Sequence, residues 1–210
     1  MFSLDAGAIR RFASKLALEK LAVIEAFAEI ASTNSYLMQK PGPAPGKISI
    51  AVTSNQTAGR GRYGKSWQSP PGSGLCLSAA YTFAARPDNL PALTLALGLG
   101  VIDALEELGA SNVELKWPND LVALNGKLGG IRAEVQNQAD SAVTVVTGVG
   151  VNFDLPDKLD FGMETSWARR VVDLKSICET LPSHEEAAGK ITTHLLRAFA
   201  DYEVSGFAGI

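Results

Sequence analysis

The sequence has few cysteines, little net charge and no long run of apolar residues. Its two cysteines, Cys76 and Cys178, lie far apart and form neither a disulfide framework nor a metal-binding spacing. Because no apolar run reaches about 18 residues, we expect no membrane-spanning helix, no signal peptide and no membrane partner. These features are typical of a reducing compartment, and we expect a cytoplasmic protein.

The small net charge and the scarcity of histidine exclude further classes. The 210 residues include 19 Lys and Arg against 22 Asp and Glu, a net charge of −3, whereas a general nucleic-acid binder needs a basic surface. The two histidines, His184 and His194, have no constellation of cysteines or carboxylates that predicts a metal site or a catalytic triad. With 46% hydrophobic residues, the chain is expected to form one globular domain over residues 1–210.

A short segment rich in glycine and cations, Gly59–Trp67 (GRGRYGKSW), is the most informative feature. Glycine lets the backbone approach a ligand closely, Arg60 and Arg62 carry donor forks suited to phosphate or carboxylate, and Trp67 offers a flat face to a base. The spacing also matches a dinucleotide fingerprint, but residues 68–74 (QSPPGSG) cannot open the helix that this fingerprint requires. A loop around a small nucleotide-like anion and a solvated basic turn are the two interpretations left.

Periodicity and turn residues predict the secondary structure. The expected elements are a helix over 6–20, a strand near 23–30, a short helix from Ser32-Thr33-Asn34 that ends at Pro41, strands at 47–52, 75–83 and 113–116, a helix over 89–108 stopped by Gly109, a hairpin of 121–124 and 127–135 around Asn125-Gly126, a strand at 141–151, and a last helix opened by a capping box of Ser183 and Glu186. The period-two alternation of 75–83 predicts a half-buried strand. Strands joined by short turns imply antiparallel pairing with the helices on one side, which is an α+β fold.

Two further segments place cations beside turn residues or glycines. In Lys116–Asp120 (KWPND) the lysine is suited to phosphate and the aspartate to Mg²⁺, although Asn and Asp beside proline also form ordinary turns. Lys127 precedes Gly129 and Gly130, and glycines inside a strand often mark close approach of a backbone or ligand; a solvated hairpin lysine is the alternative. Residues 148–152 (GVGVN) repeat this pattern, and Asn152 either reads an adenine edge or caps a turn.

Three segments in order, 59–67, 116–120 and 126–131 (GKLGGI), resemble the biotin–protein ligase family. Ser32-Thr33-Asn34, Gln56 and residues 148–152 also look like the family's pattern, so the resemblance extends from about 32 to 153. It implies a mixed, mainly antiparallel sheet flanked by helices, similar to class II aminoacyl-tRNA synthetases. It also implies ATP-dependent biotinylation of a lysine on a biotin carboxyl carrier protein through biotinyl-5′-AMP, with ATP and Mg²⁺ as cofactors.

The resemblance implies a role for each matched residue. The residues expected to bind biotin are Ser32, Thr33, Asn34, Gln56, Gly59, Arg60, Arg62 and Lys127. The residues expected to contact the nucleotide are Arg62, Trp67, Lys116, Asn119 and Asn152, with Asp120 as the candidate Mg²⁺ ligand. Lys127 and Arg60 are the expected catalytic residues, because cations stabilise the charge that builds on the α-phosphorus.

The sequence also departs from the family. Only 31 residues precede Ser32, too few for the winged-helix domain of ligases that act as repressors, so we expect no DNA binding. The chain ends at Ile210, so the family's small C-terminal β-barrel is expected to be absent or truncated. Lipoate–protein ligation and a binding module without turnover are the alternative functions. We expect a monomer or homodimer, with residues 59–67 mobile until a ligand arrives.

Overall fold

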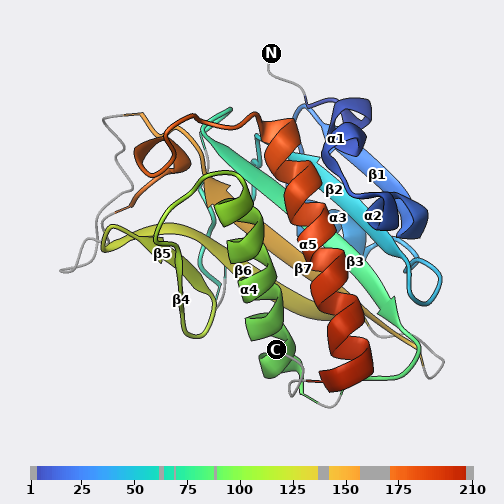
Figure 1. Cartoon of the computed structure of the whole chain (residues 1–210). Coiled ribbons are helices and arrows are strands. Elements are labelled where there is room, and N and C mark those ends of the chain that lie inside the picture. Colours follow the sequence, from blue (N-terminus) through green and yellow to red (C-terminus); the bar gives the residue numbers. More distant parts are fainter. Residues whose placement is uncertain are drawn as a thin grey trace.

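Figure 1 shows the computed structural model of the chain, which describes residues 4–61, 64–68, 70–87, 89–136, 142–156 and 171–206. A seven-stranded sheet has the order β1-β2-β3-β7-β6-β5-β4. Its strands are β1 (Leu21–Phe27), β2 (Ile48–Thr53), β3 (Gly74–Phe83), β4 (Glu114–Lys116), β5 (Asp120–Ala123), β6 (Gly126–Gln136) and β7 (Val143–Asn152). Only β1 and β2 pair in parallel, so the expected mixed, mainly antiparallel sheet is confirmed.

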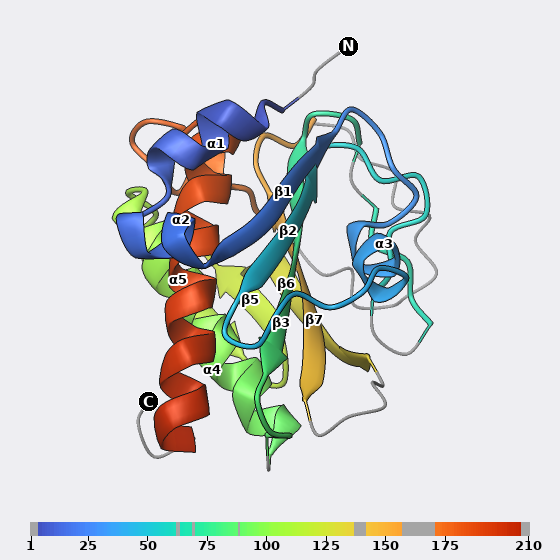
Figure 2. The same cartoon turned by 90° about the vertical axis from the view of Figure 1, so that its right-hand side faces the viewer.

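Helices cover both faces of this sheet. They are α1 (Ala6–Phe12), α2 (Lys15–Lys20), α3 (Thr33–Met38), α4 (Leu90–Glu107) and α5 (His184–Ser205), with a 3₁₀ turn, η1, at Leu174–Ser176. Figure 2 shows α3 on the opposite side of the sheet from α1, α2, α4 and α5. The expectation that all helices lie on one side was therefore wrong for α3. Leu37 of α3 packs on the small side chains of Ala51 and Ala80, which leave room for a helix on that face.

The main hydrophobic core lies between the sheet and the pair α4 and α5. Tyr81 of β3 stacks on Phe199 of α5 with ring centroids 4.8 Å apart, and Phe83 packs edge-on to the same ring at 5.9 Å. The alternating side chains of β3 do face this core, but all ten residues of β3 are buried rather than half of them. A central strand covered on both faces explains the difference, because α3 and Trp67 lie over its second face.

The N-terminal helix expected over 6–20 is two helices. Ser14 interrupts it: its hydroxyl accepts from the Ala17 amide at 3.2 Å and caps α2, and its own amide donates to Thr193 Oγ1 at 2.9 Å. α1 packs tightly on α5, since a Cβ placed on Gly189 would lie 2.6 Å from Phe12 Cβ. The break at Ser14 therefore lets the chain follow α5 and then turn into β1.

The hairpin between β5 and β6 is one residue out of the expected register. Ala123 pairs with Gly126, and the two turn residues are Leu124 and Asn125, with φ of 47° and 59°. A primed two-residue turn needs positive φ at both positions, which Asn tolerates and Leu does not favour. The Asn125-Gly126 pair therefore predicts the position of the turn to within one residue, but Gly126 is the first residue of β6 rather than part of the turn.

α4 begins and ends within one residue of the predicted range, and α5 begins where the capping box predicts. α4 is followed by Gly109 at φ 90°, and the Ser183 hydroxyl accepts from the Glu186 amide at 3.0 Å to cap α5. Within the described parts of the chain, no helix is both long and apolar enough to cross a membrane. Cys76 and Cys178 are not joined by a disulfide, as expected from their spacing.

Candidate active site

A cavity of about 320 Å³ lies on the face of the sheet that carries α3. Its floor consists of small residues that neighbour one another across β3, β7 and β6. Ser78 lies opposite Gly148, and Gly148 opposite Arg132; one row along, Cys76 lies opposite Gly150, and Gly150 opposite Gly130. The walls come from the N-terminus of α3, residues 60–61 and 65–67, and the β4–β5 turn. The small floor residues Ser78, Cys76, Gly130, Gly148 and Gly150 thus leave a hollow above the centre of the sheet.

One end of the cavity is lined by neutral polar groups. The Gln56 side-chain oxygen accepts from the Thr33 amide at 2.8 Å and from the Thr33 hydroxyl at 3.1 Å, and that hydroxyl lies 2.7 Å from Ser78 Oγ. Ser32 caps α3 by accepting from the Ser35 amide. A parallel bridge between Ile30 and Gln56 brings these two segments together. The neutral end is therefore rigid and rich in oriented donors and acceptors.

The described residues of the glycine-rich segment form a narrow hairpin beside this end. Trp67 N donates to Gly59 O at 2.9 Å, and Gly61 N to Lys65 O at 2.8 Å. A Cβ on Gly59 would lie 2.5 Å from the Trp67 carbonyl oxygen, so the close pairing requires glycine there. Gly59 shapes the hairpin without lining the cavity, whereas Arg60 lines it. Arg62, which was expected to bind biotin and nucleotide, lies outside the described residues.

The Trp67 indole lies flat against the floor. A Cβ on Gly150 would be 2.6 Å from Cε2 and Cζ2 of the ring, and a Cβ on Gly148 would be 2.8 Å from Asn34 Oδ1. The expectation that these strand glycines mark a close approach is confirmed, and the approaching groups are the chain's own side chains. Trp67 Nε1 is buried and has no hydrogen-bond partner within the described chain.

The other end of the cavity is charged. Lys127 Nζ lies 2.7 Å from Asp120 Oδ1 and 6.0 Å from the centroid of the Trp67 ring. Asn119 is anchored to β6, because its side-chain amide donates to Ile131 O at 3.0 Å and its carbonyl accepts from Ile131 N at 2.9 Å. Lys116 completes this end from the last position of β4. The β4–β5 turn thus faces Lys127 with a carboxylate and an amide.

Two charged residues that the motifs did not single out lie at the cavity: Arg132 lines it, and Glu134 lies beside it on the same face of β6. Glu134 Oε1 accepts from Arg132 at 2.8 Å and from Arg60 at 3.2 Å, and Oε2 accepts from the Asn34 side chain at 2.6 Å. The hydrogen bond from Arg132 is the main reason that the pKa of Glu134 lies below its ordinary value. Alternation of Arg132 and Glu134 along β6 was a usable signal, since period two places them on one face.

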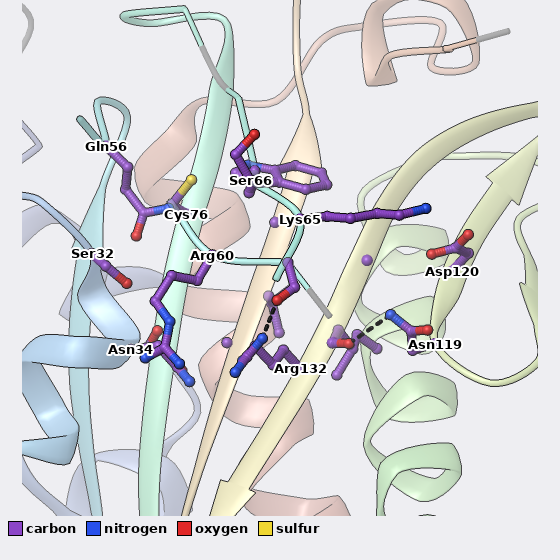
Figure 3. A pocket seen from close by; sticks show the side chains of 18 of the residues that line it. Ser32, Asn34, Gln56, Arg60, Lys65, Ser66, Cys76, Asn119, Asp120 and Arg132 are labelled. Atoms are coloured by element: carbon purple, nitrogen blue, oxygen red, sulfur yellow. Dashed lines mark hydrogen bonds between the residues drawn. The ribbon is translucent and has the colours of Figure 1, made fainter. Parts of the chain in front are cut away.

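Figure 3 shows Arg60 and Asn34 side by side at the neutral end, with Asp120 and Asn119 across the cavity. Of the predicted site residues, the cavity lining includes Ser32, Thr33, Asn34, Gln56, Arg60, Trp67, Lys116, Asn119, Asp120 and Lys127. The structure therefore brings together segments that lie up to 95 positions apart in the sequence, from Ser32 to Lys127.

Asn152 supports the backbone that carries Lys127. Its side-chain amide donates to the carbonyls of Lys127, at 3.2 Å, and Val172, at 3.0 Å, and its side chain does not line the cavity. Contact between Asn152 and adenine stays a prediction.

Comparison with known proteins identifies the family. The biotin/lipoate A/B protein ligase family matches residues 26–152, which is more than half of the chain, so the chain belongs to this family. The bifunctional ligase/repressor BirA of Salmonella typhimurium is 39% identical over 123 residues, covering 59% of this chain. The biotin–[acetyl-CoA-carboxylase] ligase of Paracoccus denitrificans is 29% identical over 189 residues, covering 86% of this chain and 76% of that protein.

Solved structures support the same assignment. A biotin protein ligase from Aquifex aeolicus, in complex with biotin and ATP, has a TM-score of 0.68 and 26% identity over 90% of this chain and 74% of that one. The expected fold class, that of class II aminoacyl-tRNA synthetases, is confirmed by this likeness. The chain spans 38% of the Salmonella relative and 49% of the Bacillus subtilis BirA.

Proposed function

We propose that the protein uses ATP to attach biotin to a lysine of a biotin carboxyl carrier protein through biotinyl-5′-AMP. The observation that supports this most directly is the polarity of the cavity: a neutral hydrogen-bonding end at Thr33 and Gln56 lies across from a charged end at Lys127 and Asp120. Biotin has the same polarity, with a neutral ureido ring at one end and a carboxylate at the other. Its carboxylate would then lie near the cation that activates it.

The neutral end also favours biotin over lipoate. A ureido ring carries a carbonyl and two N–H groups that can pair with the network of Thr33, Gln56 and Ser78. The dithiolane ring of lipoate has neither strong donors nor strong acceptors. It could add no strong hydrogen bond to this network, so lipoate would bind without the polar contacts that a ureido ring can make. Lipoate ligation is therefore the second candidate, and the family description includes it.

The first step would join biotin to AMP. A carboxylate oxygen of biotin attacks the α-phosphorus of ATP, the bond from the α-phosphorus to the bridging oxygen breaks, and pyrophosphate leaves. Two anions approach each other in this step, so cations fixed in place lower its barrier. Lys127 would bridge the carboxylate and the α-phosphate after leaving Asp120, and Arg60 would contribute a second positive charge from the neutral side.

Mg²⁺ fits the charged end as a companion of ATP. Among the described residues, no three histidines, cysteines or carboxylates gather into a metal site. Mg²⁺ in nucleotide sites is commonly held by one or two carboxylates together with phosphate oxygens and water. Asp120 would supply that carboxylate, and the ion would neutralise charge on the phosphates.

The second step would transfer biotin to the carrier. The ε-amine of a carrier lysine attacks the acyl carbon of the mixed anhydride, AMP leaves, and the amine loses a proton as the amide forms. Water would compete with the amine, so the cavity must shield the anhydride. Trp67 lies across the floor beside Lys127 and would cover the nucleotide side of the intermediate.

Exchange of labelled pyrophosphate into ATP tests the first step without a carrier. We expect exchange that depends on biotin, and transfer of label from biotin to an added carrier domain. Tight biotin binding by calorimetry with neither exchange nor transfer would instead identify a binding module without turnover. Exchange with lipoate in place of biotin would identify the second candidate.

A further inference from the structure

One carboxylate connects three separate segments beside the cavity, next to the neutral network of Thr33, Gln56 and Ser78. Glu134 of β6 accepts from Asn34 in α3, from Arg60 in the glycine-rich hairpin and from Arg132 in its own strand. Its side chain is 20% exposed, and that of Arg132 is 22% exposed, against 47% for Arg60. The pair on β6 is thus the inner, better buried part of the cluster, and Arg60 is its outer member.

Arg132 adds a second connection to the same hairpin. One terminal nitrogen of its guanidinium donates to the Gly61 carbonyl, and the other donates to Glu134 at 2.8 Å. The planar guanidinium fork fixes these two donors relative to each other, which the single ammonium of lysine does not do. Figure 3 shows the Arg132 side chain on the cavity floor with its bond toward the hairpin. Arg132 therefore binds the backbone of the hairpin at Gly61, while Glu134 binds the side chain of Arg60.

Among the described residues, Glu134 is the carboxylate that pairs with Arg60. Arg60 Nη1 also donates to Ser35 Oγ at 3.3 Å, which directs the guanidinium along the N-terminus of α3. Arg60 and Arg132 share the same oxygen of Glu134, so without that carboxylate the two guanidinium groups would repel each other and Arg60 would be released more readily into solvent. The carboxylate thus provides the charge that retains a cation in a cation-rich cavity.

We propose that Glu134 and Arg132 are positioning residues that keep Arg60 directed into the cavity before ligand binds. The identity of the ligand rests on the function proposed above, but the positioning itself does not. If the competent arrangement is less populated, the apparent affinity for ligand falls by that fraction, while the rate at saturating ligand is retained. A positioning role therefore predicts an effect on KM with little effect on kcat.

The first test measures the hairpin without any ligand. Arg132→Met and Glu134→Gln should increase the rate of tryptic cleavage after Arg60 or Lys65 about fivefold, because cleavage follows the population of the open segment. Gln136→Met is the matched control: Gln136 lies on the same face of β6 and also makes two hydrogen bonds, but to the carbonyls of Met38 and Lys40 at the end of α3. It should leave cleavage of the hairpin unchanged. Equal cleavage in all four proteins, mapped by mass spectrometry, would overturn the proposal.

The second test separates positioning from catalysis. In biotin-dependent pyrophosphate exchange, Arg132→Met and Glu134→Gln should raise the KM for biotin about fivefold and leave kcat within about twofold. Arg132→Lys should recover only part of the KM effect, because it retains the charge without the fork. A lower KM in Glu134→Gln would show that the carboxylate competes with the ligand for Arg60. A loss of kcat at unchanged KM in either variant would show a direct catalytic role. Either result contradicts the proposal. Absence of exchange in the wild-type protein would count against the proposed function alone, since the cleavage test needs no activity.

Discussion

The packing of Trp67 on Gly150 gives a prediction that divides the cavity into its two ends. In Gly150→Ala the new Cβ would lie 2.6 Å from Cε2 and Cζ2 of the indole, where ordinary contacts begin at 3.4 Å. The ring must therefore move by about 0.8 Å. The sheet blocks movement downward, and the Trp67 backbone is held by its bond to Gly59, so the ring has to shift into the cavity toward Lys127.

The size of the effect follows from this geometry. Forced repacking of a well-packed site costs typically about 1–3 kcal/mol, so the melting temperature of a domain of this size should fall by roughly 2–12 °C. The displaced indole occupies the space assigned to the nucleotide, and we expect ATP affinity to fall about tenfold. Biotin affinity should change less than about twofold, because the Thr33 and Gln56 network is not touched.

Gly148→Ala is the matched control on the same face of β7. Its Cβ would lie 2.8 Å from Asn34 Oδ1 and 3.5 Å from Ser78 Oγ, so it should weaken biotin rather than ATP. Differential scanning calorimetry measures the stability of both variants, and isothermal titration with each ligand separately measures the affinities. Identical loss of both ligands in both variants, or an unchanged melting temperature in Gly150→Ala, would refute the assignment of the two ends.

Three further predictions concern charge. Lys127→Ala should reduce pyrophosphate exchange roughly 10²–10³-fold with the fold retained, and exchange near the wild-type rate would contradict its catalytic role. Burial, with the Phe153 ring stacked at 4.1 Å, lowers the pKa of His184 below its ordinary 6.5. As the pH falls, the unfolded chain therefore takes up a proton before the folded chain does, and the stability should fall below about pH 6.5. Thermal melts of His184→Leu should lack this dependence on pH. Burial and the hydrogen bond to Glu203 raise the pKa of Tyr81. As the pH rises above about 10, the unfolded chain therefore loses this proton before the folded chain does, and the stability should fall. The fall in stability should be smaller in Tyr81→Phe.

The motifs predicted most of the site because each keeps its geometry within a few residues. A turn such as Lys116–Asp120 or a capping serine such as Ser32 is set by local hydrogen bonds, so its residues reveal both its shape and its chemistry. The long helices α4 and α5 were predictable for the same reason, through their caps and their periodicity. The prediction that these motifs meet at one cavity depended on the family resemblance, because the spacing of motifs along the chain does not fix the order of the strands.

Features that depend on the second face of the sheet were not predictable. Period two shows that side chains of β3 alternate, but Ser78 and Ala80 are small enough to face either solvent or a helix, so the position of α3 stayed hidden. The partners of Arg60 were missed for a related reason. Glu134 lies 74 positions away, and only the register of β6 against β7 brings it beneath the hairpin.

Pyrophosphate exchange into ATP, run with biotin and with lipoate in parallel, tests the central claim most directly. The polarity of the cavity predicts exchange with biotin, none above background with lipoate, and loss of the biotin signal in Lys127→Ala. Exchange that is absent with biotin, or that is supported better by lipoate, would contradict the assignment of Thr33, Gln56 and Lys127 to the two ends of a biotin site.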